Sequence, residues 1–179
     1  SSTGVIALTN QRESIYNLRV RQTVGATGES DMRCVIVESG TNGLTVINDV
    51  IIDTLGCLDL NTNSLLFGGN FINRGRFTPD GFFWNNGAGP RKLIFNGTGD
   101  QLYRNERAVA TTPNNAVRQN EAMFDFVLNK PSGNVIIGNT TNSDVVVRNS
   151  LIFEPTNKAR LIGRTNNRNT IVIPQVAGD

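Results

Sequence analysis

Short runs of β-branched and aromatic residues, each closed by Asn, Gly, Asp or Ser, recur along the whole chain and leave few folds open to it. Such runs are typical of β-strands. They begin about every six to twelve residues, which leaves no room for a helix between strands and excludes an α/β fold. The sequence therefore predicts an all-β chain. The predicted strands are residues 15–20, 35–37, 44–47, 50–52, 58–60, 64–67, 93–95, 135–137, 145–147, 151–153, 160–162 and 170–173.

Internal similarity favours a solenoid among the all-β folds. The matching segments are residues 15–20 with 123–128, 48–52 with 143–147, and 63–66 with 169–172. We predict one β-solenoid segment over residues 1–179, built of two imperfect units at about 10–103 and 121–174 with a loop excursion at 104–120. Sub-repeats of about twenty residues have the length of one coil. A right-handed, parallel β-solenoid resembling a β-helix is the main prediction, and an array of β-sandwiches is the alternative.

The side-chain composition suits stacked coils. Inward Val, Ile, Leu and Phe would form apolar ladders, while the 24 Asn and 18 Gly would occupy the corners between strands. Asn tolerates left-handed backbone there, and its amide can hydrogen-bond to the next coil. Residues 21–33 and 79–91 lack the strand pattern, so we expect long loops at these positions.

Composition also excludes several classes of chemistry. The chain has no His, so it contains no Ser-His-Asp triad, no Cys-His pair and no imidazole metal site. The carboxylates are dispersed rather than clustered, and we predict no enzymatic activity, no cofactor and no metal site. A formal net charge of +2 argues against a nucleic-acid partner. No stretch approaches the ~20 apolar residues of a membrane span, and no signal peptide is evident at the start.

The two cysteines, Cys34 and Cys57, are 23 residues apart, close to the length of one coil. They would therefore lie on adjacent coils. A disulfide between them is one reading, and it would be worth about 3 kcal/mol in the chain-entropy model. Two buried thiols acting as small apolar residues is the other reading.

An aromatic run marks one predicted loop. Phe82, Phe83 and Trp84 lie between Gly81 and Gly87, where their rings would be placed to stack on a sugar or a partner chain. A small satellite core beneath the loop is the alternative. The run supports a second function class, a carbohydrate-binding module or an inactive relative of a polysaccharide-active β-helix, with surface glycans as partners.

Several motifs resemble a known family. Residues 124–135 are similar to the "F-x-N-L-x-I-N-K-x-S-G-x-V" opening seen in giant repetitive surface proteins of Bacteroidetes, including the type IX-secreted, gliding-adhesin-like class. Residues 69–77 and 93–101 resemble their "G-x-F-x-N-x-G-x-F" and "F-N-G-T-G-D-Q" stretches, and residues 58–68 resemble their "G-x-L-x-L-x-x-N-x-L-x-L-G" segment. The resemblance extends over most of residues 15–173.

The resemblance implies a non-catalytic, structural or adhesive segment of a secreted or cell-surface protein, forming a stiff rod or filament. Its expected partners are neighbouring repeats, or copies of itself, stacked through the solenoid ends. Asp53-Thr54-Leu55 also looks like the D-[S/T]-hydrophobic O-glycosylation site of Bacteroidetes, with Thr54 as the modified residue. An ordinary turn at a strand end is the alternative reading of these three residues.

Overall fold

The computed structural model of the chain describes residues 5–6, 14–22, 34–37, 43–61, 63–78, 92–106, 123–138, 145–163 and 171–172. All the regular structure in these ranges is β-strand. The strands are β1 (Val5–Ile6), β2 (Ser14–Ile15), β3 (Leu18–Val20), β4 (Cys34–Val37), β5 (Leu44–Val46), β6 (Val50–Ile52), β7 (Cys57–Asp59), β8 (Leu65–Phe67), β9 (Phe71–Asn73), β10 (Arg76–Thr78), β11 (Lys92–Phe95), β12 (Gln101–Asn105), β13 (Met123–Leu128), β14 (Val135–Ile137), β15 (Val145–Phe153), β16 (Leu161–Gly163) and β17 (Ile171–Val172).

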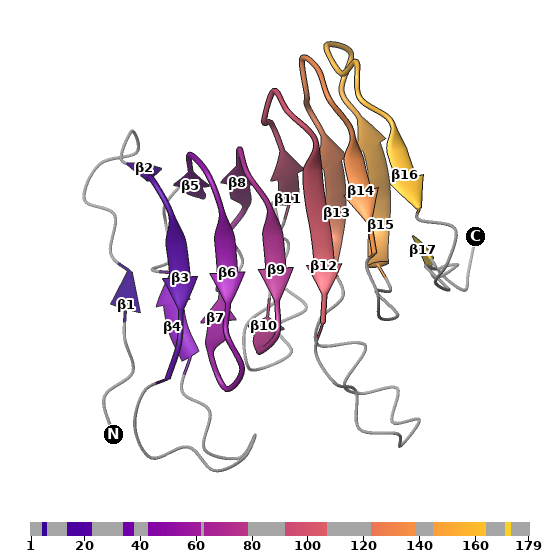
Figure 1. Ribbon diagram of the computed structural model, residues 1–179. Helices are drawn as coiled ribbons and strands as arrows, with labels where there is room; N and C mark the ends of the chain where they lie inside the picture. Colours follow the sequence, from indigo (N-terminus) through magenta and orange to yellow (C-terminus); the bar gives the residue numbers. More distant parts are fainter. Residues whose placement is uncertain are drawn as a thin grey trace.

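The strands form three parallel sheets that the chain visits in a repeating order (Figure 1). Sheet A has the order β1-β4-β7-β10, sheet B β17-β15-β13-β11-β8-β5-β2, and sheet C β16-β14-β12-β9-β6-β3. Each passage through the sheets is one coil. Coils 1 to 4 are β1–β3, β4–β6, β7–β9 and β10–β12, coil 5 contains β13 and β14, and coil 6 contains β15 and β16. This arrangement confirms the predicted parallel β-solenoid.

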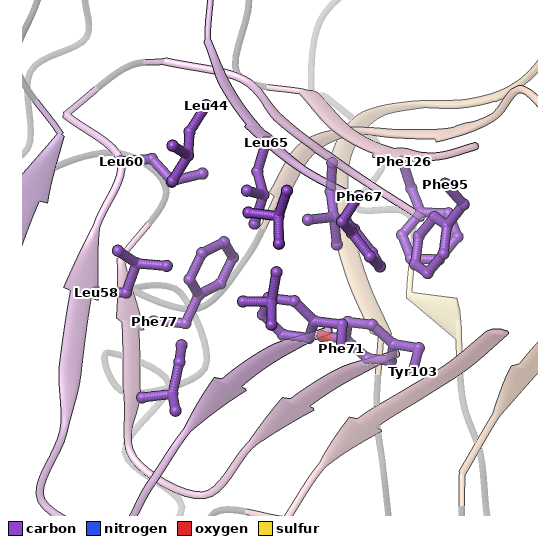
Figure 2. Packing of buried hydrophobic residues seen from close by; sticks show 14 of the residues in the cluster. Leu44, Leu58, Leu60, Leu65, Phe67, Phe71, Phe77, Phe95, Tyr103 and Phe126 are labelled. Carbon is purple, nitrogen blue, oxygen red and sulfur yellow. The ribbon is translucent and has the colours of Figure 1, made fainter. Parts of the chain in front are cut away.

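The core fills the space between the sheets, and its side chains stack in columns from coil to coil (Figure 2). In sheet B, Phe67, Phe95 and Leu128 are register partners in successive coils and are fully buried. In sheet C, Phe71 lies directly below Tyr103 with the two rings stacked at a centroid distance of 5.4 Å. Strand alternation sets these columns, because every second side chain faces inward.

A ladder of Asn and Asp side chains runs along the corner between sheets B and C. At each step, an Oδ1 atom in one coil accepts a hydrogen bond from a backbone N–H of the next coil. The five pairs are Asn17 with Asp49 at 3.2 Å, Asp49 with Asn70 at 2.6 Å, Asn70 with Leu102 at 2.9 Å, Asp100 with Asn134 at 2.8 Å, and Asn134 with Arg160 at 3.4 Å. The ladder satisfies N–H groups that the turns would otherwise leave without a partner.

Some observed strands differ from the predicted ones in their bounds or number. Residues 15–20 form two strands, β2 and β3, because the chain turns at residues 16–17 to enter sheet C. Strand β12 contains Arg104 and Asn105, which the sequence placed in the loop excursion. Residues 145–153 form one long strand rather than two. The predicted set of strands lacks β1, β9, β10, β12 and β13.

The internal match of residues 15–20 with 123–128 does not mark equivalent positions. The first segment crosses a corner between sheets, whereas the second lies in the single strand β13. The rest of the predicted excursion, residues 107–120, and the predicted loop at 79–91 lie outside the described residues.

Candidate functional site

The turns that join sheet B to sheet C form a continuous stack along one side of the solenoid, which we call the B–C turn stack. Its members are residues 16–17, 47–49, 68–70, 96–100, 129–134 and 154–160, one turn for each coil from 1 to 6. The turns lengthen along the chain, and Figure 1 shows them extending further from the sheets from β6 towards β16. Longer turns leave more backbone carbonyls to be satisfied.

Gln101 supplies donors and an acceptor inside this stack. Its side chain is buried and donates from Nε2 to the carbonyl oxygens of Phe67 (3.1 Å) and Gly69 (2.5 Å) in the coil below. Its Oε1 accepts the backbone N–H of Gly97 at 2.9 Å. Gln101 therefore ties its own turn to the preceding one.

Lys130 makes the same kind of hydrogen-bonded connection between turns one coil later. Its side chain is 0% exposed, and Nζ donates to the carbonyl oxygens of Gly97 (2.7 Å) and Gly99 (2.9 Å) and to Oε1 of Gln101 (2.6 Å). An ammonium group has three donors, and each has an acceptor here. Buried charge is tolerated only when it is hydrogen-bonded in this way. Lys130 thus joins the turn of coil 5 to the turn of coil 4.

Close backbone approach completes the junction between these two turns. Gly133 has φ 72°, and a Cβ there would overlap the backbone of Gly99. At the preceding junction, between the turns of coils 3 and 4, a Cβ on Gly97 would likewise overlap the carbonyl of Gly68. Ser132 Oγ donates to the carbonyl oxygen of Thr98 at 2.5 Å. The glycines are needed because the turns stack with almost no space between their backbones.

Two sequence motifs that resemble the Bacteroidetes surface repeats form this junction. The "F-N-G-T-G-D-Q" stretch is residues 95–101, and the "N-K-x-S-G" stretch is residues 129–133. The structure places one directly on the other. A lysine between an apolar strand and a Pro-Ser-Gly turn is the residue that sequence reasoning missed.

Burial lowers the pKa of Lys130 to about 8, and the nearby carboxylate of Asp100 opposes this effect. A lysine in an unfolded chain keeps its proton up to about pH 10.4. Between these values the unfolded chain binds more protons at this position, so the free energy of unfolding should rise with pH. Urea unfolding across this window should show a steeper rise for the wild type than for Lys130→Met. Parallel profiles would contradict the assignment of this titration to Lys130.

Within the B–C turn stack, Gln101 and Lys130 form a hydrogen-bonded clamp between neighbouring coils. Its converging oxygens hold the ammonium of the chain's own lysine, so the arrangement joins coils. Among the residues that the structure describes, no group of three or more Cys, Asp or Glu side chains is placed to hold a metal ion.

Thr54 lies on a different turn, between β6 and β7. The backbone N–H of Gly56 donates to the carbonyl of Asp53 at 2.8 Å, and Leu55 has φ 66°. Thr54 is exposed at this turn, so its hydroxyl is accessible to a modifying enzyme. The geometry accommodates both readings of Asp53-Thr54-Leu55, a glycosylation site and an ordinary turn.

The carboxylate of Asp53 belongs to a chain of alternating charges that crosses successive coils. Arg19 Nε lies 2.7 Å from Asp53 and Arg74 Nη1 lies 3.9 Å from it, while Arg74 and Arg104 contact Glu106 at 2.7 and 3.0 Å. These pairs are partly exposed, and each contributes little alone. Together they form a row of three cationic and two anionic side chains across coils 1 to 4.

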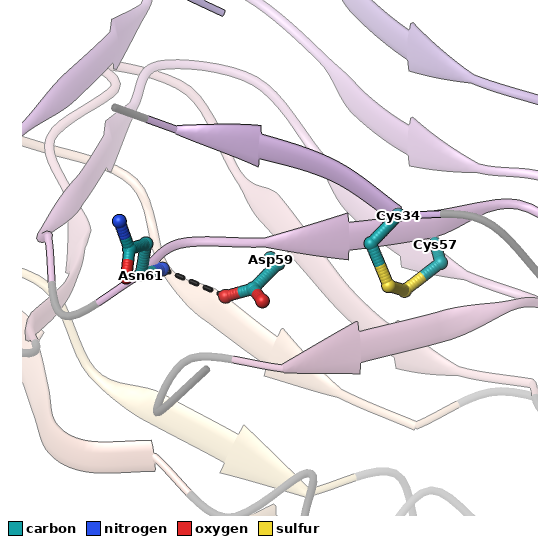
Figure 3. The surroundings of a disulfide bond; sticks show 4 residues. All are labelled: Cys34, Cys57, Asp59 and Asn61. Carbon is teal, nitrogen blue, oxygen red and sulfur yellow. Dashed lines mark hydrogen bonds between the residues drawn. A yellow bond between two sulfur atoms is a disulfide. The ribbon is translucent and has the colours of Figure 1, made fainter. Parts of the chain in front are cut away.

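Cys34 and Cys57 form a disulfide between coils 2 and 3 (Figure 3). They are register partners on β4 and β7, and both side chains are buried. Near them, the backbone N–H of Asn61, which has φ 46°, donates to Asp59 Oδ1 at 2.8 Å. A disulfide is consistent with folding in an oxidising environment.

Removing this disulfide should destabilise the fold. We expect the double variant Cys34→Ala/Cys57→Ala to lose about 3 kcal/mol of unfolding free energy, because the unfolded chain regains the entropy of a loop of this length. Urea unfolding measures the loss. A reducing agent should produce a similar loss in the wild type and none in the variant, and an equal response of both proteins would contradict the prediction.

The aromatic candidates Phe82, Phe83 and Trp84 lie outside the described residues. The structure therefore brings together only part of the predicted site set. It pairs Cys34 with Cys57 and exposes Thr54 on a separate turn.

No protein-family model, no curated protein and no solved structure matches this chain. The structure describes no helix long and apolar enough to cross a membrane.

Proposed function

We propose that this chain is a non-catalytic structural segment of a secreted or cell-surface bacterial protein, and that it serves as a stiff rod. The observation that carries the proposal is the register of the sheets: sheets B and C continue in parallel pairing from coil 1 to coil 6. Each coil is held to the next by backbone ladders, stacked side chains and the Asn and Asp corner ladder. Stacked elements of this kind resist bending because any bend must disturb several ladders together.

Three further features support the proposal. The disulfide suits an oxidising compartment. The buried clamp of Gln101 and Lys130 strengthens the coil junctions without forming a reactive site. The motifs that resemble Bacteroidetes surface repeats lie in the turns and strands that make these junctions.

Surface labelling tests the location. Antibodies raised against the folded chain should label intact cells of the organism that encodes it, and protease added outside the cells should remove the label. Labelling only after permeabilisation would overturn the proposal.

Rigidity is tested on the purified chain. Spin labels placed at Ile47→Cys and Lys158→Cys, both on the B–C turn stack, should give one narrow distance distribution when the labelled chain is diluted with unlabelled chain. A broad distribution in native buffer would show that the coils do not form a stiff unit.

The alternative function, a carbohydrate-binding module or an inactive relative of a polysaccharide-active β-helix, rests on the aromatic run of Phe82, Phe83 and Trp84. If these rings form a sugar platform, Trp84→Ala should abolish retention on immobilised surface glycans while leaving the urea midpoint unchanged. Unchanged retention would remove the carbohydrate-binding alternative and leave a purely structural rod.

A further inference from the structure

Three oxygen atoms converge on one point inside the B–C turn stack. The carbonyl oxygens of Gly97 and Gly99 and Oε1 of Gln101 lie 2.7, 2.9 and 2.6 Å from Nζ of Lys130. Oε1 also accepts the backbone N–H of Gly97, which fixes the orientation of the Gln101 amide. All three atoms accept hydrogen bonds and none can donate one. The group at their centre must therefore supply three donors.

The preceding junction shows the same matching with a different number of donors. There the carbonyl oxygens of Phe67 and Gly69 converge, and Nε2 of Gln101 donates to both, at 3.1 and 2.5 Å. An amide nitrogen has two N–H donors, whereas a protonated primary amine has three. Each junction thus holds a group with as many donors as there are acceptors. A neutral amine at the second junction would leave one oxygen facing a nitrogen lone pair.

Charge at the three oxygens also favours an ammonium ion. Burial lowers the pKa of Lys130 to about 8, while the nearby carboxylate of Asp100 raises it. Lys130 therefore keeps its positive charge at neutral pH. Asp100 is held in place because its Oδ1 accepts from the backbone N–H and from Nδ2 of Asn134, at 2.8 and 3.1 Å. The carboxylate and the three carbonyl-type oxygens together favour a cation over a neutral donor.

The surrounding backbone limits the size of the cation. A Cβ on Gly133 would overlap the backbone of Gly99, so the two turns leave no spare space beside the oxygens. The side chain of Lys130 is itself completely buried. Its ammonium arrives on an unbranched stem of four carbons. The group that fits is therefore a primary ammonium on a straight alkyl chain.

We propose that these three oxygens form a binding site for primary ammonium groups, which the native chain fills with Lys130, and that the site accepts a primary alkylammonium ion when the lysine stem is removed. Lys130→Ala keeps Cβ and removes three methylene groups and the ammonium. The ion n-propylammonium supplies the same groups. This inference is independent of the rod proposal, because it concerns only what joins the turns of coils 4 and 5.

Urea unfolding of the full chain in n-propylammonium chloride tests the proposal, with ionic strength held constant by sodium chloride. The midpoint of Lys130→Ala should rise with the ligand concentration. Above the dissociation constant, the unfolding equilibrium constant should fall about tenfold for each tenfold increase in ligand. The wild type should not respond, because Lys130 fills its site. The control Lys158→Ala, which changes an exposed side chain, should behave as the wild type does.

Tetramethylammonium chloride distinguishes the site from a general salt effect, because this ion has the same charge but no N–H donor. It should leave the midpoint of Lys130→Ala unchanged. No response of this variant to n-propylammonium, or an equal response to the two ions, would overturn the proposal.

Nuclear magnetic resonance of the nitrogen-15-labelled wild type gives a second test that does not depend on how well the variant folds. At neutral pH, Nζ of Lys130 should give an ammonium signal whose protons exchange slowly with water and show contacts to Gly97 and Gly99. The ammonium protons of Lys92 and Lys158, which are partly or fully exposed, should exchange too fast to be seen. A neutral-amine nitrogen shift at Lys130, or no protected signal, would contradict the assignment.

Discussion

Replacing Lys130 with Met should lower the free energy of unfolding by about 3 kcal/mol or more. Met has a similar length and fills most of the same space, but it has no hydrogen-bond donor. The oxygens of Gly97, Gly99 and Gln101 would each lose a partner inside the turn stack. A buried acceptor left unsatisfied costs about 1 to 3 kcal/mol, so a large loss is expected even if water reaches part of the site. Urea unfolding measures it.

Lys158 provides a matched control one coil further on. Its side chain is exposed, while its backbone N–H donates to the carbonyl of Lys130 and would still do so after substitution. Lys158→Met should therefore change stability by no more than about 0.5 kcal/mol. Equal losses in the two variants would mean that the three hydrogen bonds of Lys130 contribute nothing specific.

The second large effect is expected at Phe95, where Ala should cost about 3 to 5 kcal/mol. The ring lies between Phe67 and Phe126, with centroid distances of 4.6 Å to each. It is fully buried. Removing it leaves a cavity in the middle of a column that neighbouring coils cannot collapse into, because backbone ladders fix their spacing.

Tyr16→Ala is the control for Phe95→Ala, since it also removes an aromatic ring but from a side chain that is 65% exposed. We expect it to change stability by no more than about 0.5 kcal/mol. The midpoint of thermal or urea unfolding distinguishes the two variants. A small effect at Phe95 would show that the core is not packed as tightly as the ring distances indicate.

Only part of the candidate site could be predicted from the sequence. The spacing of Cys34 and Cys57 placed them on adjacent coils, and they are register partners in the structure. The turn motifs at residues 95–101 and 129–133 are recognisable in the sequence, but the sequence does not predict that one turn stacks on the other. Chain separation between hydrogen-bonded corner residues varies from 21 for Asp49 and Asn70 to 34 for Asp100 and Asn134. Without a constant period, the stacking partner of a turn cannot be counted along the chain.

The sequence by itself determined the all-β character, the solenoid class and the positions of most strands. Alternation of apolar residues and the Asn and Gly at the corners are local signals, and they reflect backbone preferences that act within a few residues. Tertiary structure alone decided that residues 15–20 bend into two sheets, that Lys130 inserts among the oxygens of coil 4, and that coil 6 leaves Phe153 exposed. These features depend on which coil lies above and below each residue, and that is set by packing between segments far apart in the chain.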